Sequence, residues 1–151
     1  MRKYIGYTIL SILTVLLMSC DKMPMNGDLD GMWQLVSEQL DGESGQTDRK
    51  PDRIYISFQL HTAQFDGHGK VGAYYSTFCH KGDTLRFQNI CAKSMNETKE
   101  DDNRPLTEEE IKANMRDWGF VSLNPAFKVE MLNSKHMVLR SDFSTLRFRK
   151  F

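Results

Sequence analysis

The chain has 151 residues, with 20 Lys and Arg against 20 Asp and Glu. This length corresponds to one domain, and the balanced charge gives no basic footprint of the kind that nucleic-acid binders carry. Only four Pro and ten Gly argue against a disordered or collagen-like chain. The composition therefore indicates one globular domain and leaves its ligand and activity open.

Residues 1–19 have the pattern of a secretory signal. Arg2 and Lys3 give a basic start, residues 5–18 are mostly apolar, and no acidic residue precedes Asp21. A charged start followed by a short apolar run is typical of a signal peptide. The apolar run is shorter than the ~20 residues that a comfortable transmembrane helix needs. We therefore expect residues 1–19 to be removed on export.

The end of this signal resembles the lipobox of bacterial lipoproteins, in the residues Leu17-Met18-Ser19-Cys20. The resemblance implies cleavage before Cys20 and a diacylglycerol on the Cys20 sulfur. Two acyl chains suit stable membrane anchoring, since one chain alone binds only marginally. Residues 20–30 are polar and contain Pro24 and Gly27, and we interpret them as a tether. The alternative is an ordinary secreted protein with a coincidental cysteine.

Alternating hydrophobicity predicts about eight short strands in residues 31–151. The clearest is Arg53–Leu60, where four apolar side chains alternate with polar ones. The phase shifts near His61, which suggests a bulge or corner there, and Asp41–Asp52 is expected to be a loop. The remaining strands are predicted at Met32–Leu40, around residues 63–65, and at Val71–Phe78, Thr84–Ile90, Ala126–Leu132, His136–Arg140 and Ser144–Lys150.

The pattern of these strands indicates a closed antiparallel sheet. Half-apolar alternation is typical of antiparallel strands with one buried face. Short connections favour pairing between neighbours in the sequence, and an up-and-down meander that closes on itself removes its exposed edges.

One helix is predicted between the fifth and sixth of these segments, at about residues 107–118. Thr107 and Glu110 have the spacing of a capping box. Ile111, Met115 and Trp118 recur at helical spacing and form one apolar stripe. We expect this helix to pack at one end of the sheet, either as a lid or as a fixed plug.

Two cysteines, Cys79 and Cys91, remain in the mature chain, and we expect no disulfide between them. An exported domain permits one, but the two residues fall on neighbouring strands of a predicted hairpin that turns at residues 80–83. In that hairpin Cys79 lies opposite Thr84 or Leu85, whereas Cys91 lies opposite residue 72 or 73. At about 3.3 Å per residue, the two sulfurs are beyond bonding distance.

The residues Gly31-Met32-Trp33 match the G-x-W that opens the first strand of lipocalin-type barrels. With the lipobox, the polar tether, the turn at residues 82–85 and the Trp-ended helix, the chain resembles the small lipocalin-like lipoproteins of Bacteroidetes over about Gly31–Phe151. The resemblance implies a mainly β fold, an eight-stranded antiparallel up-and-down barrel with one short α-helix, exposed at the cell envelope. It brings no established activity or ligand.

The inward side chains of such a barrel either line a ligand pocket or fill the interior. The resemblance also implies that an arginine side chain of the last strand covers the ring of Trp33. Arg147 and Arg149 are the candidates. The candidate pocket residues are Trp33, Phe58, Phe87, Met115, Trp118, Phe127 and Met131.

No residue pattern points to chemistry. The four histidines, His61, His68, His80 and His136, show no metal-site spacing. The chain also has no G-x-S-x-G elbow and no phosphate-binding glycine pattern. We therefore expect no catalysis, no metal and no cofactor.

The leading hypothesis is an exported, lipid-anchored cell-envelope protein, at the outer membrane rather than the inner one, that binds a small, mostly apolar ligand in its barrel. The alternative is a filled barrel that acts as a protein- or glycan-interaction module at the cell surface. No nucleic-acid partner is expected.

Overall fold

The computed structural model describes residues 25–92 and 104–151. The predicted signal peptide and Cys20 lie outside the described residues. Within the described part of the chain, no helix is long and apolar enough to cross a membrane.

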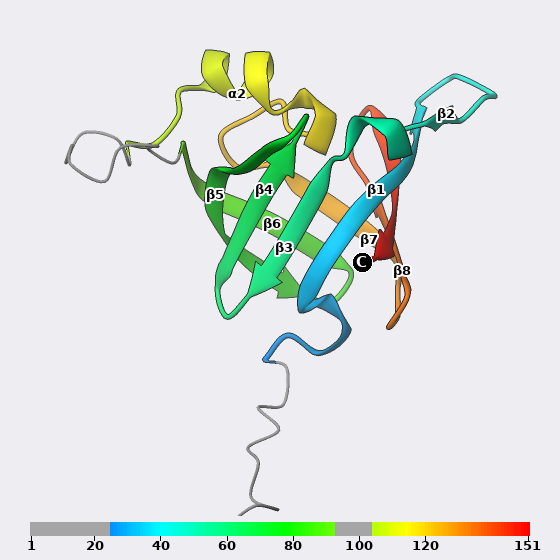
Figure 1. Cartoon of the computed structure of the whole chain (residues 1–151), viewed down its shortest axis with the longest axis horizontal. Helices are drawn as coiled ribbons and strands as arrows, with labels where there is room; N and C mark the ends of the chain where they lie inside the picture. Colours follow the sequence, from blue (N-terminus) through cyan, green and yellow to red (C-terminus); the bar gives the residue numbers. More distant parts are fainter. Residues whose placement is uncertain (1–24, 93–103) are drawn as a thin grey trace, which may run out of the picture.

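The described residues form one antiparallel sheet with strand order β2-β1-β3-β4-β5-β6-β7-β8-β9, and β1 also pairs with β9. This last pairing closes the eight strands β1 and β3–β9 into an up-and-down barrel, as the sequence predicts (Figure 1). The strands are β1 (Gly31–Leu40), β2 (Thr47–Asp48), β3 (Tyr55–Gln59), β4 (Thr62–Gly67), β5 (Lys70–Lys81), β6 (Thr84–Ala92), β7 (Ala126–Leu132), β8 (His136–Arg140) and β9 (Ser144–Lys150).

Alternation along the strands places the apolar residues inside the barrel. Ile54, Ile56 and Phe58 around β3 and Phe127 on β7 are all buried, while Val129 is partly buried against the same core. Strand β2 is an addition to the predicted set, because two residues of the expected loop Asp41–Asp52 pair with β1. It lies outside the closed barrel.

The phase shift near His61 is a hairpin turn rather than a bulge or corner. Gln59 of β3 pairs with Thr62 of β4, so Leu60 and His61 form a two-residue turn. Leu60 has a positive φ of 55°. Because the chain reverses there, the inward positions change phase without any interruption of the sheet.

A bulge in β7 overturns one predicted inward position. The pairing of β7 with β8 shifts between Val129 and Met131. An extra residue in one strand rotates the following side chains to the other face. Met131 is consequently 49% exposed and does not point into the barrel with Phe127, contrary to the sequence prediction.

The hairpin of β5 and β6 turns at Gly82-Asp83, because Lys81 pairs with Thr84. Cys79 therefore lies opposite Arg86 rather than Thr84 or Leu85. Cys91 lies opposite Tyr75 rather than residue 72 or 73, since a register shift follows Tyr75. Both cysteines are free thiols in the structure.

The predicted helix is confirmed with an earlier end. Helix α2 (Glu108–Asn114) begins with the expected capping box. The Thr107 hydroxyl accepts a hydrogen bond from the Glu110 backbone N–H at 3.3 Å, and the Glu110 carboxylate accepts one from the Thr107 N–H at 2.8 Å. A separate 3₁₀ turn, η4 (Arg116–Trp118), follows and ends at Gly119.

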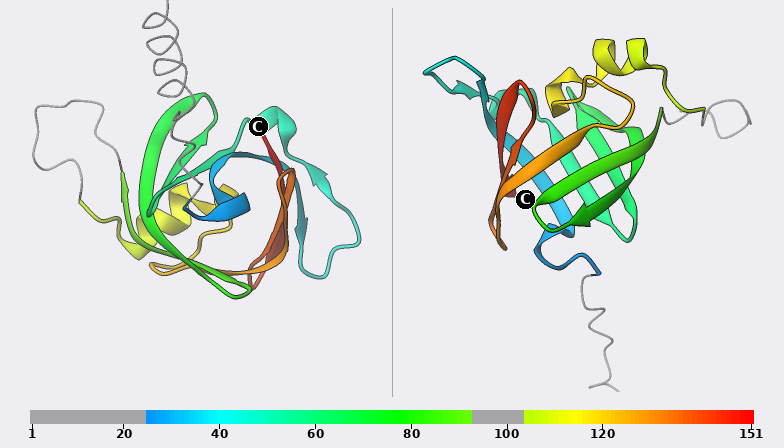
Figure 2. Two further views of the ribbon diagram at one scale, coloured as in Figure 1. Left: turned by 90° about the horizontal axis from the view of Figure 1, so that it is seen from below. Right: turned by 180° about the vertical axis from the view of Figure 1, so that it is seen from behind.

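The barrel begins inside the segment predicted as a tether. A 3₁₀ turn, η1 (Gly27–Leu29), precedes β1, and Leu29 is only 1% exposed. Seen along the barrel, η1 lies across its mouth (Figure 2). The last residues of the predicted tether therefore belong to the fold.

The barrel thus has two distinct ends. The N-terminal end carries η1, the Leu60–His61 turn, the Gly82–Asp83 turn and the β7–β8 turn. Strand β9 also runs toward this end, and the Phe151 N–H that follows it donates to the Met32 carbonyl. The helix end carries α2, η4, the turn between β4 and β5, and η2 (Lys50–Asp52), which follows β2 (Figure 1).

Candidate functional site

The barrel interior holds six of the seven candidate pocket residues. They are Trp33, Phe58, Phe87, Met115, Trp118 and Phe127, and all are buried. Met131, the seventh, lies on the outer surface. The sequence therefore assigned six of its seven candidates to the interior correctly.

Aromatic rings fill the middle of this interior. The centroid of the Phe87 ring lies 4.9 Å from that of Phe120, 5.7 Å from that of Phe65 and 5.9 Å from that of Phe127. Phe65 and Phe120 are also in edge contact at 5.1 Å. These spacings are those of packed aromatic pairs. Phe87 and Phe127 thus pack against each other and against neighbouring rings in the middle of the barrel.

Two of these filling residues were missing from the sequence-based candidates. Phe65 lies on β4, and its alternation with Gln64 could have identified it. Phe120 follows η4 in an irregular segment, so no periodic signal marks it. Phe120 enters the barrel because Gly119 turns the chain inward with φ of 79°, and a Cβ at Gly119 would lie 2.9 Å from Phe127 and Leu146.

Trp33 closes the N-terminal end. Its indole N–H donates a hydrogen bond to the Leu29 carbonyl at 2.8 Å, which fixes η1 over the ring. The Lys150 ammonium lies 4.9 Å from the ring centroid. Gly31 allows this approach, because a Cβ there would lie 3.0 Å from Lys150 Cε and the residue has a positive φ of 110°.

The cation over Trp33 corrects the expectation that Arg147 or Arg149 would lie there. Trp33 pairs directly with Lys150 in the register of β1 and β9. Arg149 points to the other face and donates two hydrogen bonds to Gln34 Oε1, at 2.9 and 2.7 Å. The alternation of β9 therefore selects Lys150 and excludes its arginine neighbour.

Trp118 closes the helix end. Its indole N–H donates to the Tyr55 carbonyl at 3.0 Å. The ring packs edge-on against Phe65 and Tyr74, with centroids 6.0 Å apart in each case. A Cβ at Gly67 would lie 2.8 Å from Trp118 Cζ2, so this close approach requires glycine.

An ion-pair network centred on Arg49 holds the same end. Arg49 Nη1 lies 2.6 Å from Glu38 Oε2, Nε lies 2.7 Å from Asp52 Oδ2, and Nη2 lies 2.7 Å from Asp117 Oδ1. The other Asp117 oxygen is 2.8 Å from His68 Nε2. The network joins β1 and η2 to η4 and to the turn after β4.

This network shifts the titration of Asp117. Partial burial by itself would raise the pKa of the Asp117 carboxyl, but hydrogen bonds with His68 and Arg49 outweigh it and lower that pKa below its ordinary value of 3.8. On α2, hydrogen bonds from the Arg104 guanidinium and the Thr107 backbone lower the pKa of Glu110 to about 2. Carboxylates thus help to hold the elements of the helix end together.

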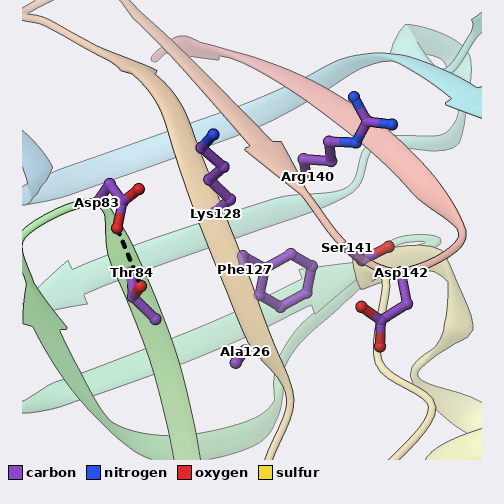
Figure 3. A pocket seen from close by; sticks show the side chains of 8 residues that line it. All are labelled: Asp83, Thr84, Ala126, Phe127, Lys128, Arg140, Ser141 and Asp142. Carbon is purple, nitrogen blue, oxygen red and sulfur yellow. Dashed lines mark hydrogen bonds between the residues drawn. The ribbon is translucent and has the colours of Figure 1, made fainter.

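Two hollows open on the outer surface. One, with a volume of about 380 Å³, is lined by Asp83 of the β5–β6 turn and by residues of β6, β7, β8 and the turn after β8 (Figure 3). Lys128 and Arg140 lie side by side in it, since they are paired in the sheet, with Thr84 and Asp142 nearby. The other, of about 320 Å³, lies beside β1 and β2 and is lined by Ser37, Asp48 and Lys50 among others.

The described residues contain no group of three or more His, Cys, Asp or Glu side chains placed to hold a metal ion. His68 is engaged with Asp117, and His61, His80 and His136 are exposed at the N-terminal end of the barrel.

Comparison with known proteins identifies a family. A family model described as a lipocalin-like domain matches residues 15–151. None of the curated proteins matches the chain.

Three solved structures are similar in fold. A lipocalin-like protein from Bacteroides uniformis is 24% identical, with a TM-score of 0.55 over 83% of this chain and 100% of its own. An uncharacterized protein from Bacteroides eggerthii is 23% identical, with a TM-score of 0.51 over 82% of this chain and 99% of its own. A protein from Burkholderia xenovorans is 14% identical, with a TM-score of 0.50 over 82% of this chain and 83% of its own.

Proposed function

Because this chain belongs to the lipocalin-like domain family, we propose that it is a lipid-anchored barrel of the cell envelope that acts through its outer surface. In this proposal the barrel is an interaction module for a protein or a glycan, and it performs no catalysis. The family fold is compatible with ligand binding or with such a module, so the choice depends on the interior.

The packing of the interior is the observation that carries the choice. Phe87 contacts Phe58, Phe65, Phe120 and Phe127 with ring centroids 4.9 to 6.1 Å apart. An eight-stranded barrel is just wide enough to be filled by its own side chains. A small apolar ligand would have to displace these rings, whereas the surface hollows are accessible without any rearrangement.

A titration with the apolar fluorophore N-phenyl-1-naphthylamine tests this choice. We expect no saturable binding to the unaltered protein. Phe120→Ala provides the matched control, because deleting a buried ring leaves an apolar cavity that small hydrophobic molecules can enter. Saturable one-to-one binding by the unaltered protein would instead establish the interior as a ligand site and would contradict the proposal that the barrel is an interaction module.

The hollow with Lys128 and Arg140 is the contact surface that the proposal favours. Both side chains are exposed and positively charged. The surrounding hydroxyl and carboxylate groups add further hydrogen-bond donors and acceptors. Such a surface suits acidic groups on a glycan or a protein loop. Arg140 is also within 3.6 Å of Asp41 and 3.7 Å of Glu130, which orient it.

Binding to an array of acidic and neutral glycans, together with crosslinking to envelope proteins in intact cells, tests this surface. We expect a specific signal that the double variant Lys128→Ala/Arg140→Ala loses. Lys135→Ala, an exposed lysine outside the hollow, is the control and should keep the signal. Equal signals for the double variant and the control would exclude the hollow as the contact surface.

The lipid anchor is supported by the lipobox-like residues Leu17–Cys20. Growth with a clickable palmitate analogue should label the protein, and Cys20→Ala should remain unlabelled and leave the detergent-rich phase on phase separation. Separation of inner and outer membranes should recover the labelled protein with the outer membrane. A Cys20→Ala protein that stays in the detergent-rich phase contradicts the anchor.

A further inference from the structure

We propose that the N-terminal end of the barrel rests directly on the lipid bilayer, with Met32, Leu60 and Phe151 in the headgroup region. This inference rests on the proposed anchor at Cys20 and adds to it an orientation and a second, non-covalent membrane contact. The helix end would then face away from the membrane and remain accessible to a partner.

Exposed apolar side chains gather at this end. Among the described residues, the large hydrophobic side chains that remain exposed are Met25, Met32, Leu60, Leu123, Met131 and Phe151. Single exposed apolar residues are normal on any protein. Four of these six, however, belong to segments of the N-terminal end. Met25 and Met32 flank η1, Leu60 lies in the β3–β4 turn and is 61% exposed, and Phe151 follows β9 and is 73% exposed.

Backbone contacts fix the positions of these residues. The Phe151 N–H donates to the Met32 carbonyl at 2.8 Å, so the two exposed side chains leave neighbouring strand ends. The Asn26 side chain donates to the Leu60 carbonyl at 2.8 Å, which ties the β3–β4 turn to the entering chain next to Met25. The Phe151 ring packs edge-on against Tyr55 of β3, with centroids 5.4 Å apart, so it lies along the outer wall of the barrel beside Met32.

The length of chain before the barrel selects the bilayer as the occupant. Met25 follows Cys20 by five residues, which span about 17 Å even when fully extended. The headgroup region of a bilayer is itself roughly 5–7 Å deep on each side. A lipid attached at Cys20 would therefore hold this end against the membrane surface at high effective concentration.

The charges of this end are compatible with a neutral lipid surface. Lys81, Lys135 and Lys150 are offset by Asp28, Asp30 and Asp83, so these charges balance and form no strong basic patch. Lys150 is also engaged, because its ammonium donates to the Asp28 carbonyl at 2.8 Å. We therefore expect the contact to form on zwitterionic vesicles and to depend weakly on salt.

Quenching by brominated lipid tests the placement in the lipidated mature chain. Phe151→Trp and Leu60→Trp place reporters at the N-terminal end, and Leu123→Trp is the matched control, since Leu123 is 45% exposed and lies next to the helix end. Each variant is reconstituted into phosphatidylcholine vesicles brominated near the headgroups. Emission of the unsubstituted chain, which contains Trp33 and Trp118, is subtracted.

We expect both reporters at the N-terminal end to lose about half of their emission, because indoles favour the membrane interface and would lie near the bromine atoms, while Leu123→Trp loses none. Flotation of the vesicles, which reports whether the protein is membrane-bound, is measured in the same samples.

If the protein floats with the vesicles but its three reporters are quenched equally or not at all, the lipid anchor is retained and the contact of the N-terminal end with the bilayer is excluded. If only one of Phe151→Trp and Leu60→Trp is quenched, the end-on orientation is overturned. If the protein does not float, the anchor itself fails and both proposals fall.

Discussion

Each end of the barrel is closed by a tryptophan, but the two closures are built differently. Trp33 bonds to Leu29, only four residues earlier, so the N-terminal end is closed by the chain that enters it. Trp118 bonds to Tyr55, 63 residues away, and the Arg49 network reinforces that contact. The first closure combines the neighbouring turn η1 with a single cation, Lys150, whereas the second joins segments far apart in the sequence and includes the several ion pairs of Arg49. We therefore expect the helix end to respond to pH and to network substitutions more than the N-terminal end does.

The largest expected effect is the loss of either tryptophan. Trp33→Ala and Trp118→Ala should each lower the free energy of unfolding by about 3–5 kcal/mol, because each leaves a large cavity and an unpaired carbonyl. Urea denaturation measures the loss. Hydrogen exchange on the folded variants then distinguishes the two ends. Trp33→Ala should increase exchange of the amides near η1, and Trp118→Ala should increase exchange of the amides of α2. Exchange that rises equally at both ends for both variants would contradict two independent closures.

A smaller effect is expected at Gly67, which touches only the helix end. Gly67→Ala places a methyl group 2.8 Å from a rigid indole ring and should destabilise the protein by about 1–3 kcal/mol. Gly45→Ala is the matched control, because a Cβ there meets nothing within 4 Å and it should change stability by less than about 0.5 kcal/mol. The thermal midpoints of the two variants provide the measurement, and equal midpoints would show that Trp118 moves freely.

The next smaller loss of stability is expected when Arg49, the centre of the ion-pair network, is replaced. Arg49→Met keeps much of the side-chain length and should cost about 1–2 kcal/mol, since charge-assisted hydrogen bonds are lost but their partners are partly exposed. Arg49→Lys should recover only part of it, because an ammonium cannot span three carboxylates as a guanidinium does. Arg86→Met, at an exposed position on β6, serves as the control in denaturant titrations. A loss no larger than that of the control would show that the network adds nothing to the closure.

The smallest expected effect concerns pH. The pKa of Asp117 is lowered in the folded protein, so its contribution to stability is complete above its ordinary value of 3.8 and is lost as the pH falls through the lowered value. The stability difference between the unaltered protein and Asp117→Asn should therefore be largest near neutral pH and shrink below pH 3.8. Thermal midpoints measured across that range provide the test. A difference that is constant with pH would show that Asp117 acts only through packing.

The sequence determined the sheet more fully than the site. Residues that alternate strictly, such as Ile54, Ile56 and Phe58, were placed correctly because the two-residue period of a strand fixes which face each side chain occupies. The capping box at Thr107 was equally reliable, because its partners are three residues apart. Met131 was misplaced because a bulge is set by the partner strand.

What the sequence by itself determined is therefore the local part of this protein: its strands, its capped helix and the inward aromatics at regular positions. Only the tertiary structure decided that Lys150 covers Trp33 and that Phe65 and Phe120 meet Phe87 in the middle of the barrel. These contacts join residues far apart in the chain, where register and turn geometry set the positions of side chains to within an ångström. Periodicity shows which way a side chain points, but not whether another ring occupies the space it points into.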